Sequence, residues 1–262
     1  MSATLTAPTR DTLLSEPKPS LATLTKVELR KAYDTRAGFW LLATIAAITL
    51  LILVLAVLVF EEGDQRFDTL SQIMQVPTSF LLPVVGILLV TSEWSQRSAL
   101  TTFTLTPNRW RVIAAKALAL SALTLAAIAI TYLGAAIATA LTGPPEAWTD
   151  AFGSFPNVLA VQFAASFVGF GFALAFLSSP LAIVLYFVLP TAWTILVNTV
   201  PGLDDVATWL DLNTTTNELL PAGDSGMSVT SSDWAHLGTS LLLWLVVPLA
   251  IGLWRLSRAE VK

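Results

Sequence analysis

The residues of this chain best suited to specific polar chemistry lie in one stretch, residues 92–116, between two long apolar segments. Glu93, Arg97 and Arg109 are among its charged groups. Carboxylates and guanidinium groups form ion pairs and charge-assisted hydrogen bonds with another macromolecule. Because the stretch is long for a simple turn, we expect a docking surface. The alternative is a basic loop that only follows the charge bias of membrane proteins.

The same stretch carries a helix-start signal. Thr106-Pro107 combines an N-cap side chain with proline at the first helical position. A helix from Pro107 to Leu141 would be about 50 Å long at 1.5 Å per residue. It would exceed the thickness of a bilayer, so its first two turns should stand outside the lipid. Residues 98–105 would form a separate short helix at the tip of the loop.

A second set of candidate residues consists of polar side chains inside apolar segments. We expect them either to line a pathway through the membrane or to form hydrogen bonds with a neighbouring helix. These residues are Tyr132, Gln162, Ser166, Tyr186, Thr191, Thr194 and Asn198. Small residues at four-residue spacing, Ala165, Gly169 and Ala173, predict the close approach of another helix.

Enzyme signatures are missing from the sequence. It has no GxxxxGK[ST] phosphate loop, HExxH or GxSxG motif, so the chain is not expected to hydrolyse ATP by itself. There are no cysteines, and the only histidine is His236, which we interpret as a surface or capping residue. We therefore expect no catalytic residues and no metal site. Acids are absent from the apolar segments, which argues against an ion-coupled carrier.

The elements that must position these residues are membrane spans. Of the 262 residues, 55% are hydrophobic and only 12% are charged, about half of the charged fraction of a soluble domain. We predict an all-α polytopic membrane protein, with proline marking a kink at Pro83. The six predicted transmembrane helices are 39–60, 74–92, 112–141, 155–177, 181–200 and 237–254.

The chain before the first span divides into two parts. Residues 1–20 are polar and irregular and are predicted to be a disordered tail. Residues 21–36 have a helical composition and predict an N-terminal interfacial helix, or alternatively a solvated linker. Glu28 falls on the apolar side of this helix. Lys116, the exceptional charge near the start of the third span, is expected to snorkel to the interface.

The distribution of basic residues predicts the topology. With both termini cytoplasmic, all of the 14 lysine and arginine residues except Arg66 lie inside. The outer segment 201–236 contains no lysine or arginine but six acids. Residues 206–212 have apolar side chains at helical spacing. By its residues alone, the segment is interpreted as an acidic surface loop.

The loop and the segment before the first span together resemble a known family. Along the chain, the loop has a glutamate, an arginine, a pair of threonines, a leucine two residues before a proline, an arginine and a lysine. These are Glu93, Arg97, Thr101-Thr102, Leu105, Pro107, Arg109 and Lys116, preceded by Glu28, Arg30 and Lys31. This pattern resembles the permease subunits of ATP-binding-cassette transporters of the type-2, exporter-like family. The usual glycine before the threonine is absent here, and Ser98-Ala99-Leu100 stands in its place.

The resemblance implies a division of labour between subunits. A separate ATPase subunit would bind ATP and Mg²⁺ and dock on the 92–111 loop, so this chain would hold no cofactor. Carried over by position, the coupling residues are Glu93, Arg97, Thr101, Thr102, Leu105, Pro107 and Arg109. Two permease chains, identical or different, would pair in a bacterial plasma membrane and export a substrate, with no nucleic-acid partner. The resemblance also implies that segment 201–236 is re-entrant, dips into the outer leaflet and helps to close the exit; the alternative is an acidic surface loop.

Three other functions stay open at this point. A membrane-embedded enzyme would need catalytic clusters, and an ion-coupled carrier would need membrane acids. A non-transporting anchor subunit is the third alternative. Within the favoured function, Arg109 would alternatively anchor lipid phosphates, and Glu93 would only pair with Arg97 one turn away.

Overall fold

The computed structural model describes residues 19–61, 65–95, 109–149, 151–220 and 229–258. Every regular element within these ranges is a helix, and six of the helices are long and apolar enough to cross a membrane, which confirms the predicted fold class. The predicted tail and most of the loop, residues 96–108, lie outside the described residues.

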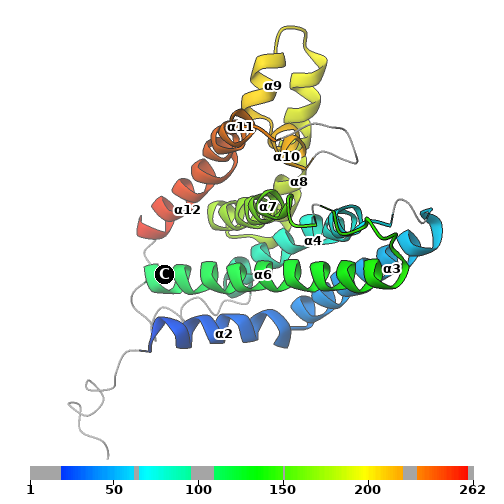
Figure 1. Cartoon of the computed structure of the whole chain (residues 1–262). Helices are drawn as coiled ribbons and strands as arrows, with labels where there is room; N and C mark the ends of the chain where they lie inside the picture. Colours follow the sequence, from blue (N-terminus) through cyan, green and yellow to red (C-terminus); the bar gives the residue numbers. More distant parts are fainter. Residues whose placement is uncertain (1–18, 62–64, 96–108, 150, 221–228, 259–262) are drawn as a thin grey trace, which may run out of the picture.

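Four of the six membrane-spanning helices begin and end within three residues of the predicted limits, whereas the second and sixth spans are longer than predicted. The elements, in chain order (Figure 1), are α2 (Leu21–Asp34), α3 (Arg36–Val59), α4 (Phe67–Ser95), α6 (Arg109–Thr142), α7 (Phe155–Phe176), α8 (Ser179–Thr199), α9 (Asp204–Leu210), α10 (Leu212–Leu219), α11 (Ser231–Leu241), the π-helical turn η2 (Leu242–Val246) and α12 (Val247–Arg258). The last three follow one another without a break and together form the sixth span.

The second span is longer than predicted. Helix α4 begins at Phe67, whereas the polar residues near its start favoured a beginning at residue 74. These polar groups are satisfied inside the protein, because Ser71 donates to the carbonyl of Asp68 at 2.9 Å and Gln75 donates to Thr131 at 2.7 Å. The helix continues through both Pro77 and Pro83.

Helix α7 lies at the centre of the bundle, where α4, α8 and the sixth span pack around it (Figure 1). The predicted close approach occurs at Gly169, where a Cβ atom would come within 2.9 Å of the backbone oxygen of Pro83 on α4. At Gly252 on α12, a Cβ atom would come within 2.5 Å of Leu174 on α7. Glycine lets these helices pack backbone to backbone.

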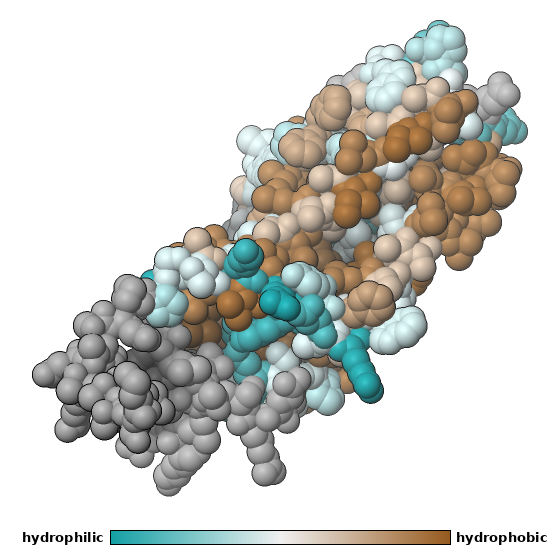
Figure 2. Space-filling view, turned by 90° about the horizontal axis from the view of Figure 1, so that it is seen from below, coloured by the Kyte–Doolittle hydropathy of each residue, from teal (hydrophilic) through white to brown (hydrophobic). Residues whose placement is uncertain are grey.

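The outer surface of the bundle is apolar, as the lipid requires. Large exposed side chains include Leu58 on α3, Leu133 on α6 and Ile195 on α8. Figure 2 shows hydrophobic residues covering the middle of one face, with hydrophilic residues gathered toward its two ends. This arrangement matches the distribution of charge that the sequence predicts for a membrane protein.

One end of the bundle gathers the start of α2, the start of α6 and the end of the sixth span. Arg111 on α6 donates to the carbonyl of Pro19 at 2.8 Å, and Arg109 donates to the carbonyl of Leu256 on α12. At the same end, Arg255 donates to the carbonyl of Ala175 near the end of α7. Basic side chains therefore satisfy the last carbonyl groups of two helices.

We expect cysteines at two exposed positions to report which side of the membrane each end faces. Asp205→Cys, in the outer segment, should react with an impermeant maleimide in intact cells. Lys26→Cys, on α2, should react only after the cells are permeabilised. The native chain contains no cysteine and gives no background labelling. Labelling of Lys26→Cys alone in intact cells would contradict the topology.

The crossing of α4 and α7 gives a prediction for stability. Gly169→Ala should lower the melting temperature of the purified protein, because the new methyl group meets the backbone of Pro83. Gly238→Ala is the matched control, since nothing lies within 4 Å of the position that its new methyl group would take. Alanine favours a helix by about 1 kcal/mol over glycine, so the control should be neutral or stabilising. Equal melting temperatures for the two variants would refute this packing.

Candidate functional site

A cluster of two acids and two lysines joins α2 to α4 and α6, the two helices between which the predicted docking loop lies. Glu28 and Lys31 are one turn apart on α2, Glu93 lies in the last turn of α4, and Lys116 lies in the second turn of α6. The cluster contains two positive and two negative charges. Glu28, Glu93 and Lys116 have side chains at most 6% exposed, whereas the side chain of Lys31 is 37% exposed.

Lys116 occupies the centre of this cluster. Its Nζ lies 2.8 Å from Glu28, 3.2 Å from Glu93 and 2.8 Å from the carbonyl oxygen of Leu89. An ammonium group has three N–H donors, so each has an acceptor here. The prediction that Lys116 snorkels to the interface is wrong, because partners inside the protein replace water around its charge.

Lys31 closes the cluster on its solvent side. Its Nζ lies 2.7 Å from Glu28 and 2.7 Å from Glu93, so one ammonium group links α2 to α4. Partial burial disfavours the charged form of Lys31. The hydrogen bonds to Glu28 and Glu93 outweigh that effect and hold the pKa of Lys31 above its ordinary value. Lys31 therefore stays charged at neutral pH.

Apolar packing surrounds these ion pairs. Ala32 on α2, Leu89 on α4 and Ala119 on α6 are buried against one another, with Leu29 and Leu123 beside them. Glu28 falls on the apolar side of α2 because that side faces α6. Charges removed from water in this way are stable only when they are paired.

The structure describes only part of the predicted coupling set. Glu93 belongs to the charge cluster, and Arg109 binds the end of α12. Arg97, Thr101, Thr102, Leu105 and Pro107 lie outside the described residues. In the sequence, Glu28 and Lys116 stand out as misplaced charges, but nothing there predicts that they meet.

A second polar cluster lies within the membrane-spanning part of the bundle. Gln162 on α7 donates to Oε1 of Gln75 on α4 at 2.6 Å, and Ser79 donates to Gln162 at 2.8 Å. Thr131 on α6 accepts from Gln75, so one chain of hydrogen bonds joins three spans. Gln75 and Gln162 are buried.

The predicted pathway residues divide into two groups. Tyr132 packs edge-on against Phe67, with ring centroids 5.6 Å apart, and Ser166 accepts a hydrogen bond from Thr124. Asn198 donates to the carbonyl of Thr194 within its own helix. Thr194 likewise donates to the carboxylate of Asp211. These four and Gln162 make contacts within or between helices, whereas Tyr186 and Thr191 line a cavity.

This cavity has a volume of about 420 Å³ and lies between α4, α7, α8 and α10. Its lining is mainly apolar, with amide and hydroxyl groups from Gln75, Ser79 and Asn217. Asn217 belongs to α10, so segment 201–236 helps to form the cavity wall. A space of this size falls in the range of small-molecule binding sites.

The sequence matches the family model of the ABC-2 family transporter proteins over residues 45–261. The chain belongs to this family. The match covers all six spans of the ABC-2 chain except the first turns of α3, and it includes Glu93 and Lys116. Glu28 and Lys31 precede the matched residues. No curated protein matches the chain.

The charge cluster predicts a large effect of removing its central lysine. Lys116→Met should destabilise the purified ABC-2 chain by about 3–5 kcal/mol, because two buried carboxylates lose a shared partner. Adding Glu28→Gln should recover part of that loss, since it removes one of the two acids. Unfolding by denaturant in detergent measures both effects.

The control is an exposed ion pair on the same helix as Glu28. Arg30 lies 2.7 Å from Asp34, but its side chain is 74% exposed. Arg30→Met should therefore change stability by about 0–1 kcal/mol. If Lys116→Met cost no more than Arg30→Met, the buried cluster would not exist as described.

Proposed function

We propose that this chain is the permease subunit of an ATP-driven exporter, in which a separate ATPase subunit docks on the 92–111 loop. Membership of the ABC-2 family supports the role of a membrane transport component, and chains of this family generally work with a separate ATPase subunit. The chain would lie in a bacterial plasma membrane with both termini in the cytoplasm, and it would pair with a second permease chain.

The charge cluster would transmit movement of the docking loop to the membrane-spanning helices. The docking loop leaves the bundle at the end of α4 and re-enters it at the start of α6. Glu93 lies in the last turn of α4, and Lys116 lies in the second turn of α6. Both residues are linked to α2, because Lys116 pairs with Glu28 and Glu93 pairs with Lys31. A push on the loop therefore acts on three helices joined by paired charges. In this proposal they move together when the ATPase closes.

The lining of the cavity between α4, α7, α8 and α10 supports the proposal that the substrate is amphipathic. Its walls combine aromatic and aliphatic side chains with a few neutral hydrogen-bonding groups. Among the described residues that line the cavity there is no lysine or arginine. Such a lining favours a largely apolar molecule with amide or hydroxyl groups over a multiply charged one. ATP and Mg²⁺ would be bound by the partner subunit.

Lys31 offers a test that spares the fold. In Lys31→Met, Lys116 still faces both carboxylates, and water can reach the position of the partly exposed Lys31 side chain, so the chain should insert and assemble normally. The link from α2 to α4 becomes weaker, however, and we expect less substrate transported for each ATP hydrolysed. Transport and ATPase activity are measured side by side on the complex that copurifies with the chain.

Lys26→Met is the matched control, because Lys26 lies on the exposed side of the same helix. It should leave the ratio of transport to hydrolysis unchanged. A wild-type ratio in Lys31→Met would contradict the coupling role of the cluster. A purified chain that pumps without any ATPase would contradict the proposed function itself and would favour an ion-coupled carrier.

A further inference from the structure

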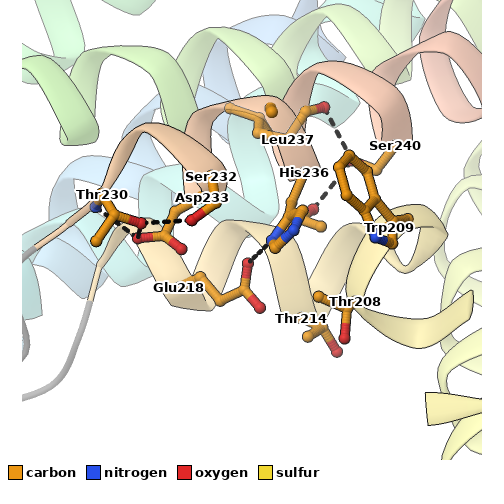
Figure 3. Close-up of polar contacts among 12 residues, drawn as sticks. Thr208, Trp209, Thr214, Glu218, Thr230, Ser232, Asp233, His236, Leu237 and Ser240 are labelled. Carbon is orange, nitrogen blue, oxygen red and sulfur yellow. Dashed lines mark hydrogen bonds and ion pairs between the residues drawn. The ribbon is translucent and has the colours of Figure 1, made fainter. Parts of the chain in front are cut away.

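Three metal-ligating side chains meet at the opposite end of the bundle from the charge cluster. Glu218 lies near the end of α10, while Asp233 and His236 lie on α11. One ligand atom from each of the three falls within 4.8 Å of the others. Figure 3 shows Glu218 directed at His236 from the neighbouring helix, with Asp233 one turn away.

The spacing of these residues suits a shared ligand. Asp233 and His236 stand three positions apart on one helix and therefore project from the same face. An acid and a histidine at this spacing, joined by a carboxylate from another helix, form metal sites in helical bundles. The Nδ1 atom of His236 lies 3.1 Å from Oε2 of Glu218. Two ligands of a tetrahedral zinc ion lie roughly 3.3 Å apart, given metal–ligand distances of about 2.0–2.1 Å.

The ligands are held in place by their neighbours. The ring of Trp209 packs edge-on against the imidazole of His236, with centroids 4.4 Å apart. Asp233 accepts a hydrogen bond from the backbone N–H of Thr230 at 2.7 Å through Oδ2. The side chain of His236 is 13% exposed and that of Glu218 is 28% exposed, so the group is only partly open to ions from solvent.

The charge around the cluster also favours a cation. Residues 201–236 contain six acids and no lysine or arginine, so no basic side chain of this segment neutralises Glu218 and Asp233. Imidazole and carboxylate ligands together favour zinc and similar transition metals over magnesium or calcium, which prefer oxygen ligands alone. We propose that Glu218, Asp233 and His236 bind one divalent transition-metal ion of the zinc type.

Such an ion would fasten α10 to α11. Helix α10 also contributes Asn213, Thr216 and Asn217 to the wall of the cavity, so the ion would hold that wall in place. The sequence did not predict a metal site, because Glu218 is 18 residues from His236 and only the fold of α10 against α11 joins them.

The test uses the full-length protein in lipid nanodiscs, stripped of metal with a chelator. Zn²⁺ binding is measured by calorimetry, and Co²⁺ is used as a spectroscopic probe of ligand geometry. We expect one Zn²⁺ per chain and at least a tenfold weaker affinity in Glu218→Gln and in Asp233→Asn. Asp205→Asn, which removes an exposed acid from the same segment, should bind Zn²⁺ like the wild type.

Melting temperature separates metal binding from a folding defect. Glu218→Gln keeps an acceptor for His236, so without metal it should melt at the wild-type temperature. Zn²⁺ should raise the melting temperature of the wild type but not that of Glu218→Gln. Hydrogen exchange of residues 212–219 should slow with Zn²⁺ in the wild type only. Equal binding by all variants, or full competition by Mg²⁺, would show adventitious binding and overturn the proposal.

Discussion

Burial of the Lys116 ammonium group is the constraint on which the loop end of the structure depends. A lysine held among apolar residues needs acceptors for all three of its N–H groups. The protein supplies them from α2, from the last turn of α4 and from the carbonyl of Leu89. Helix α2 is therefore fixed against α4 and α6 by paired charges as well as by apolar contact.

The end of the bundle that holds α9 and α10 is joined by a different kind of contact. Asp211 is fully buried between α9 and α10, where it accepts hydrogen bonds from Thr214 at 2.6 Å and from Thr194 on α8 at 2.6 Å. The indole N–H of Trp244, within η2, donates to the carbonyl of Leu210 at 2.9 Å. These contacts fix α9 and α10 against α8, which lines the cavity, and against the sixth span. Movement at the loop end would reach the cavity through the spans, because α4 borders both.

Much of this architecture could be predicted from local sequence. Uncharged runs predicted the six spans, and the small residues around Gly169 predicted the close approach that α7 makes with α4. The charge cluster could not be assembled in the same way, because Glu93 is 62 residues from Lys31 and Lys116 is 88 residues from Glu28. Glu28 and Lys116 stood out in the sequence as anomalies, an acid on an apolar face and a lysine inside a span, whereas Glu93 was predicted only as a residue of the docking loop. An acid and a base misplaced in this way, on helices at the same end of a bundle, are themselves evidence that the helices touch.

In the function proposed for this chain, α2 and the start of α6 move as one unit when the partner ATPase binds nucleotide. Spin labels at Lys26 and Trp110, both exposed, report the distance within this unit. A label at Lys26 paired with one at the matching position of the second permease chain reports movement of the unit as a whole. In the assembled complex, ATP should leave the first distance unchanged and alter the second. A change in the first distance, or no change in either, would contradict the claim.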